Sequence, residues 1–107
     1  MHIDDEGWGW HMKIGIGLWC LQSTATAPRS FTQAYAELRE DAELAERVGV
    51  HSLWLSEHHG YYDGYCPAPL PAAAAALSAT ESLVVGTGVL LLPLQDADRV
   101  GRAAADL

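Results

Sequence analysis

The sequence predicts an α/β fold in which three parallel strands are each followed by a helix. Strand-like apolar runs begin near residues 13, 52 and 83, at intervals of roughly 30–40 residues. The segments between them are long enough for a helical crossover, which parallel neighbours require and which should be right-handed. Half of the residues (50%) are apolar and 19% are charged, a composition typical of a folded chain.

The first strand is expected over residues 13–20, KIGIGLWC, where apolar residues alternate with glycine. After a polar loop, Ser30 and Gln33 fit a capping box at the start of a helix. Gly49 follows the helical pattern and predicts a left-handed stop. On this helix, the apolar side chains expected to face the protein core are those of Tyr35, Leu38, Ala42, Ala45 and Val48.

A second short strand is expected over residues 52–56, and it leads into the triplet Glu57-His58-His59. A loop rich in glycine, tyrosine and proline follows, over residues 60–69. Pro71 fits the first turn of a second helix that continues over residues 72–79, because proline is tolerated where helical N–H groups have no partner.

The third strand is expected over residues 83–92, LVVGTGVLLL. A continuous run of branched apolar residues is typical of a strand buried on both faces of a parallel sheet. Pro93 ends the run, and Asp96 or Asp98 can cap a third helix over residues 99–107. Three parallel strands leave two open edges and one uncovered face, which predicts the first part of a larger fold.

Charge and composition exclude several classes of partner. The formal net charge of −8 argues against nucleic acid or an anionic membrane surface, since both attract basic proteins. No apolar run approaches the roughly 20 residues of a membrane span, and no secretory signal is recognised. With two cysteines, no disulfide framework is expected, and a cytoplasmic location is predicted. Residues 1–11 predict a flexible tail, and residues 12–107 the domain that follows it.

Glycine spacing distinguishes the doubly wound nucleotide fold from the (β/α)8 barrel. The pairs Gly15/Gly17 and Gly86/Gly88 each begin G-x-G-x-x-G, but Cys20 and Leu91 stand where the third glycine belongs. Both pairs also lie within strands, where glycine marks close packing or the close approach of a flat ligand. The barrel is therefore favoured.

A barrel places its functional groups at the carboxyl ends of its strands. In this chain these ends are Trp19-Cys20, Glu57-His58-His59 and Leu92-Pro93. Alternation along the chain places Glu57 and His59 on one side and His58 on the other, which is poor geometry for one metal ion. We therefore predict no metal site, and His58 as a proton-handling residue in a polar active-site lining.

The chain resembles the luciferase-like flavin monooxygenases. The resemblance rests on the order and spacing of LWLSEHH (53–59), Pro69 with its alanine-rich helix, ATE (79–81), VGTGV (85–89) and Leu92-Pro93. It implies the N-terminal (β/α)3 portion of a TIM barrel, with the barrel incomplete. It also implies a monooxygenase or oxidoreductase that uses reduced FMN and oxygen to oxidise a small organic substrate.

The resemblance also implies roles for particular residues. His58 would lie beside the reacting part of the flavin as the catalytic residue, and a non-proline cis peptide is expected at Gly88–Val89, under the flavin ring. The predicted cofactor-binding residues are Glu57, Thr87, Gly88 and Val89, and the predicted substrate-binding residues are Trp19 and Tyr61. A reductase would supply the reduced FMN; a deazaflavin coenzyme is the alternative, and the Glu-His-His triplet favours FMN.

The length of the chain leaves its activity open, because a complete barrel needs about 250 residues. One hypothesis is a flavin-dependent monooxygenase or its N-terminal segment. The alternative is a truncated, inactive fragment that acts only by self-association or with a partner chain. The expected partners are a small-molecule substrate and oxygen, together with a homo-oligomer or a missing C-terminal partner.

Overall fold

The computed structural model describes residues 12–17, 21–63 and 65–107. The elements are β1 (Gly15–Gly17), α1 (Phe31–Arg47), β2 (Ser52–Leu55), α2 (Pro69–Leu77), β3 (Val84–Thr87), the short 3-10 helix η1 (Leu92–Leu94) and α3 (Ala97–Ala105). This order confirms the predicted alternation of strands and helices. The tail predicted over residues 1–11 and the predicted substrate residue Trp19 lie outside the described residues.

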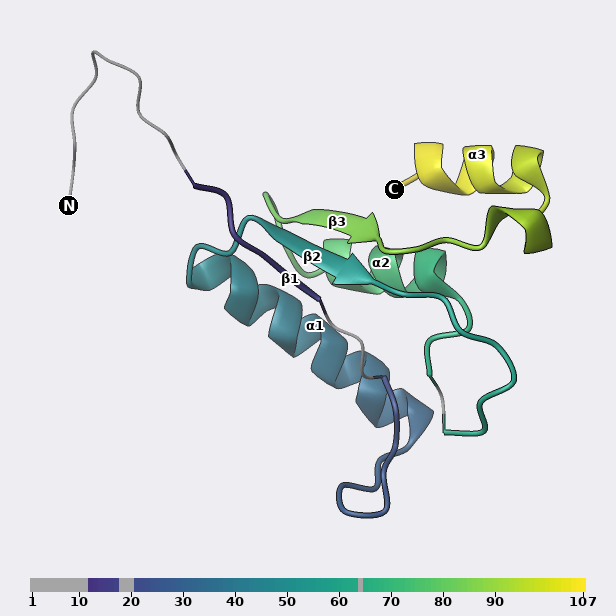
Figure 1. Cartoon of the computed structure of the whole chain (residues 1–107). Helices are drawn as coiled ribbons and strands as arrows, with labels where there is room; N and C mark the ends of the chain where they lie inside the picture. Colours follow the sequence, from purple (N-terminus) through teal and green to yellow (C-terminus); the bar gives the residue numbers. More distant parts are fainter. Residues whose placement is uncertain (1–11, 18–20, 64) are drawn as a thin grey trace, which may run out of the picture.

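The three strands form one parallel sheet in the order β1-β2-β3, as predicted (Figure 1). Gly15, Ser52 and Val84 are aligned across the sheet, and Ile16, Leu53 and Val85 form the next row. Since successive residues of a strand point to opposite faces, the first row faces away from the second.

Helices α1 and α2 cover one face of the sheet. Leu53 and Leu55 of β2 are fully buried there against small residues of both helices. On the opposite face, within the described part of the chain, Trp54 and Val84 are 46% and 47% exposed. The predicted uncovered face is therefore present. The buried apolar core consists of Leu21, Ala34, Leu38, Ala42, Ala45, Leu53, Leu55, Cys66, Ala72, Ala73, Ala76 and Leu83.

Helix α1 begins and ends where its capping residues predict. The Ser30 side chain accepts the N–H of Gln33, whose side chain accepts the N–H of Ser30. Gly49 adopts φ +84°, a conformation that costs other residues energy. The expectation that Val48 faces the core was wrong: it is 67% exposed, because it lies after the last helical residue.

Helices α2 and α3 each begin two residues earlier than expected, at Pro69 and Ala97. Pro69 starts α2 because the first helical N–H needs no helical partner. Of the two acids considered as caps for α3, Asp96 fills the position and accepts the N–H of Arg99.

The prediction of one long buried strand over residues 83–92 was wrong. Strand pairing ends at Thr87, and the apolar run continues as a connector into η1. Val84, Val89, Leu92 and Leu94 are all exposed. A strand is buried on both faces only when a second layer and a further strand pack against it, and neither is present among the described residues.

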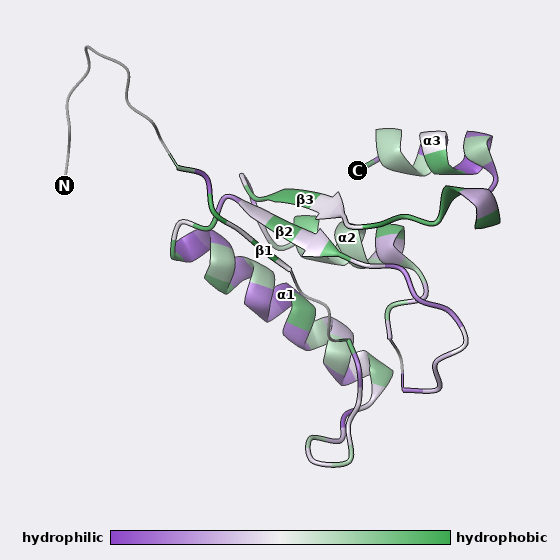
Figure 2. Ribbon diagram, in the orientation of Figure 1, coloured by the Kyte–Doolittle hydropathy of each residue, from purple (hydrophilic) through white to green (hydrophobic). Residues whose placement is uncertain are grey.

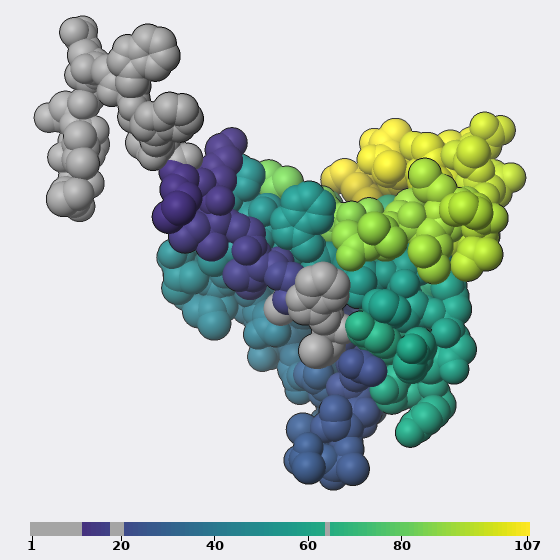
Figure 3. Space-filling model, viewed as in Figure 1, coloured from purple at the N-terminus to yellow at the C-terminus, as the bar shows by residue number. Residues whose placement is uncertain are grey.

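The distribution of apolar side chains follows this arrangement. Figure 2 shows alternating hydrophilic and hydrophobic segments along α1, whereas β3 and the connector that follows are largely hydrophobic. In Figure 3 the segment from the connector to α3, in yellow-green and yellow, forms a lobe at one end of the molecule. None of the described helices has the length and apolar character needed to cross a membrane.

Candidate functional site

The carboxyl ends of β2 and β3 lie side by side and remain connected beyond the paired strands. The Gly88 N–H donates to the Leu55 carbonyl at 2.6 Å, and the Glu57 N–H donates to the Val89 carbonyl at 3.1 Å. These bonds hold residues 56–59 next to residues 88–91. The peptide bond between Gly88 and Val89 is cis, as the family resemblance implied.

His58 lies in an aromatic cluster at this end of β2. Its imidazole stacks on the Tyr65 ring at a centroid distance of 3.7 Å and an interplanar angle of 9°. Tyr61 packs edge-on against Tyr65 at 5.2 Å and against His58 at 6.1 Å. The His58 main-chain N–H donates to the Cys66 carbonyl, so the loop that carries the tyrosines is bonded to the backbone of His58. The structure therefore brings the predicted residues His58 and Tyr61 together.

Two buried polar atoms lack a hydrogen-bond partner among the described residues: Ser56 Oγ and His58 Nε2. They lie two residues apart and on the same side of the chain, as Ser52 and Trp54 do further down β2. A buried polar atom without a partner is destabilising, so native proteins rarely contain one without a functional reason. Both atoms lie at the carboxyl end of β2, where the sequence predicts the site.

Glu57 points to the other side and is fully enclosed, with 0% of its side chain exposed. Its Oε2 accepts the Leu91 N–H at 2.6 Å, and its Oε1 accepts the Gln95 side-chain amide at 2.7 Å. His59 Nε2 lies 2.5 Å from Oε1. Burial alone raises the pKa of the Glu57 carboxyl, but the hydrogen bonds from His59, Leu91 and Gln95 outweigh it and hold the pKa below its ordinary value.

Trp54, on the uncovered face, was not predicted as a site residue from the sequence. Its indole N–H donates to Ser52 Oγ at 3.1 Å, and its ring lies between two glycines. A Cβ added at Gly86 would stand 2.7 Å from the ring, and one added at Gly15 would stand 3.0 Å from the indole nitrogen. The sequence did contain a signal. Trp54 is the one tryptophan of the second predicted strand, and the predicted strands on both sides of it contain glycines.

Gly88 differs from the other strand glycines. A Cβ there would lie 3.7 Å from the Trp54 ring, an ordinary contact, and apart from its chain neighbours no other described residue lies within 4 Å of it. Val89 is 61% exposed. Thr87 is paired with Leu55, whose side chain faces the helices, so the register places Thr87 away from Gly86 and the uncovered face.

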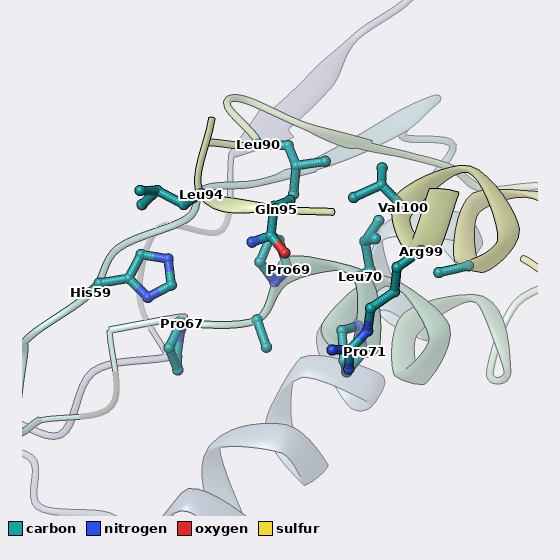
Figure 4. Close-up of a pocket in the computed structure, with 12 residues that line it drawn as sticks. His59, Pro67, Pro69, Leu70, Pro71, Leu90, Leu94, Gln95, Arg99 and Val100 are labelled. Atoms are coloured by element: carbon teal, nitrogen blue, oxygen red, sulfur yellow. The ribbon is translucent and has the colours of Figure 1, made fainter. Parts of the chain in front are cut away.

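A separate cavity of about 420 Å³ lies between the start of α2, η1 and α3 (Figure 4). Its walls are mostly proline and aliphatic side chains, with His59, Gln95 and Arg99 as the polar residues. His58 is not among its lining residues, so this cavity is distinct from the aromatic cluster. No group of three or more metal-ligating side chains occurs in the described ranges. Glu57 and His59 are hydrogen-bonded to each other.

The family and two of the curated proteins that the chain matches are described as monooxygenases. Residues 12–107 match the family described as luciferase-like monooxygenase. The chain is 38% identical over 64 residues to the alkanal monooxygenase alpha chain of Photorhabdus laumondii. It is 33% identical over 61 residues to the oxygenase component of the flavin-dependent trigonelline monooxygenase of Acinetobacter baylyi. These alignments cover 60% and 57% of the chain.

A solved structure shares the fold. The oxygenating constituent of 3,6-diketocamphane monooxygenase from Pseudomonas putida, a type II Baeyer-Villiger monooxygenase in complex with FMN, superimposes with a TM-score of 0.75 at 25% identity. The match covers 86% of the chain but 24% of that structure. The aligned segments amount to 18% and 17% of the alkanal and trigonelline enzymes. The chain thus spans about a fifth of its relatives' length.

Proposed function

The chain belongs to the luciferase-like monooxygenase family, and from that premise we propose that it carries the first part of a flavin-dependent monooxygenase site. The site would use reduced FMN and oxygen to oxidise a small organic substrate. The supporting relatives are monooxygenases, one named flavin-dependent and one solved in complex with FMN.

The observation that carries this proposal is the pair of unpartnered buried atoms, Ser56 Oγ and His58 Nε2, at the carboxyl end of β2. Near them Gly88 presents backbone with no side chain, and among the described residues only the Trp54 ring would contact a Cβ added there. These features fit a flavin: its ring is planar, and its edge offers polar atoms to hydroxyl and imidazole groups. When bound, reduced FMN supplies the electrons for oxygen activation.

The residues of this chain have separable tasks. Gly88 and Val89 form the bed for the ring, and Thr87, the last paired residue of β3, holds the backbone that leads into it. His58 holds or delivers a proton at Nε2, since an imidazole nitrogen can act as general acid or base. Tyr65 fixes the imidazole by stacking, and Tyr61, with Trp19, contributes to the substrate wall. Apolar rings of this kind also exclude water from the reacting groups.

FMN is preferred over a deazaflavin coenzyme, because the structural relative holds FMN. A cytoplasmic location is part of the same proposal. Cys66 is a free, buried thiol, which suits a reducing compartment.

A second candidate is a fragment that works only by self-association or with a partner chain. The observation that favours it is the exposed apolar surface at the open edge of the sheet, over Val84, Val89, Leu92 and Leu94. Surface of this kind is normally covered by further structure. On this candidate the chain would bind flavin only after that surface is covered.

The deciding experiment is a titration of the chain with FMN, followed by oxidation of the bound, chemically reduced flavin by oxygen. We expect His58→Ala to slow the oxygen reaction far more than it weakens FMN binding. His51→Ala is the matched control, because His51 lies before β2, at its opposite end. Equal behaviour of the two variants would contradict the role of His58. Flavin binding that begins only on dimerisation or with an added partner chain would favour the second candidate.

A further inference from the structure

We propose that Glu57 is a positioning residue that holds the segment 88–95, and with it the flavin bed, against the end of β2. The inference rests on the proposed function for the identity of the bed, but its structural part stands on hydrogen bonds alone. It assigns Glu57 a role behind the site rather than a direct contact with the cofactor.

The first step concerns the backbone. The regular pairing of β2 with β3 ends at Leu55 and Thr87. Two more main-chain bonds follow, from Gly88 to the Leu55 carbonyl and from Glu57 to the Val89 carbonyl. Beyond them no main-chain bond joins the two segments in the described ranges, and the Leu91 N–H donates to a side chain instead.

The Glu57 carboxylate supplies the missing acceptor. Its Oε2 accepts the Leu91 N–H at 2.6 Å, and its Oε1 accepts the Gln95 side chain at 2.7 Å. One buried side chain therefore ties down both ends of the segment from Leu91 to Gln95. Hydrogen bonds to an ionised acceptor are shorter and stronger than neutral ones, which suits a segment with little other packing.

The geometry favours this positioning role over the direct cofactor contact predicted from the resemblance. The side chain is 0% exposed, and both oxygens already accept protein donors. Because Glu57 directly precedes His58, the same anchor sets the separation between the imidazole and the Gly88–Val89 bed. A shift of the connector would move the bed relative to His58 without changing either residue.

The charged and titratable groups that face Glu57 are few among the described residues. His59 bonds to it from the same loop, and the Cys66 thiol lies near enough for the carboxylate charge to raise its pKa further. Gln95, from the turn before α3, is neutral. A carboxylate suits this position, because its two oxygens accept from the Leu91 N–H and from Gln95, whereas a glutamine keeps only one acceptor oxygen.

The test compares the chain with Glu57→Gln by amide hydrogen exchange and by titration with FMN. We expect protection of the Leu91 amide to fall at least about tenfold, while core amides of β2 keep theirs. FMN affinity should fall by about the same factor. In the parent chain, Leu91 protection, corrected for intrinsic exchange, should also decrease as acid protonates Glu57, and in the variant it should be independent of pH. Glu81→Gln, at an exposed carboxylate, is the matched control.

The outcomes separate the two proposals. Unchanged Leu91 protection in Glu57→Gln, or lost protection with unchanged FMN affinity, would overturn the positioning role. A parent chain that binds no FMN would refute the proposed function for this chain, and the exchange data would still decide whether Glu57 holds the connector. If Glu57→Gln does not fold, Gln95→Leu is the second variant, because it removes only one of the donors to Glu57. It should lower the exchange protection of the amides of residues 92–95 and leave the Leu91 amide protected. Unchanged protection of residues 92–95 would refute the proposal.

Discussion

The packing of Trp54 against Gly86 yields a quantitative prediction. Gly86→Ala would place a Cβ 2.7 Å and 2.8 Å from two carbons of the indole, well inside contact distance. The ring is held by its bond to Ser52 and is limited on its other side by Gly15. It therefore has to swing outward and lose that hydrogen bond.

The magnitude follows from two opposing effects. Crowding of a filled site costs about 1–3 kcal/mol. Replacing glycine by alanine recovers about 0.4–1 kcal/mol by restricting the unfolded chain. We expect a net loss of about 1–2 kcal/mol in the free energy of unfolding. For a chain of this size, that lowers Tm by roughly 5–15 °C.

Gly88→Ala is the matched control, because a Cβ there would meet the same ring at 3.7 Å, an ordinary contact. We expect its stability to equal or slightly exceed that of the parent. The assay is urea unfolding followed by circular dichroism, with the indole N–H resonance of Trp54 monitored by NMR. If Gly86→Ala is as stable as Gly88→Ala and the resonance does not shift, the indole is not confined and the reasoning fails.

Three further predictions concern stability. Leu38→Ala should lower the free energy of unfolding, measured by urea titration, by about 2–5 kcal/mol. The control Leu44→Ala, on the exposed side of α1, should change it by less than about 0.5 kcal/mol. Similar losses in the two variants would contradict the assigned core. Ser30→Ala should cost about 0.5–2 kcal/mol by removing the α1 cap, and a chain that unfolds at the parent's urea midpoint would argue against that cap. The pKa of the Glu46 carboxyl lies below its ordinary value, chiefly because the Ser82 backbone N–H donates to it, so its contribution is complete above the ordinary glutamate pKa and is lost as pH falls through the lowered value. Glu46→Gln should therefore be less stable than the parent at neutral pH and should approach it in acid; a difference independent of pH would refute this.

Much of the fold could be predicted from local sequence. Ser30 and Gln33 close a capping box within one turn, and Gly49 ends the helix through its own backbone freedom. The parallel order of the strands follows from the length of the crossovers, because a short link could not reach a parallel neighbour. Side-chain alternation also placed Glu57 and His59 together and His58 apart, as the structure shows.

The candidate site could be predicted only in part. His58 and the Gly88–Val89 peptide were identified by resemblance, and whether either acts on a flavin stays a prediction. The acceptor role of Glu57 could not be predicted, because its donors, Leu91 and Gln95, lie more than thirty residues further along the chain. The stacking of Tyr65 on His58 depends likewise on how the loop closes.

Tertiary structure also decided what the apolar run after residue 83 becomes. Its composition alone indicates a long strand with two buried faces, but a strand extends only as far as a neighbour offers hydrogen-bond partners. β2 is paired with it only from Ser52 to Leu55, so β3 ends at Thr87 and the remaining apolar residues form an exposed connector. The sequence by itself determined where helices start and stop and which residues alternate on a strand, since those depend on neighbouring residues. Which glycines pack against Trp54, and which carboxylate holds the connector, depended on register between strands, which only the folded chain defines.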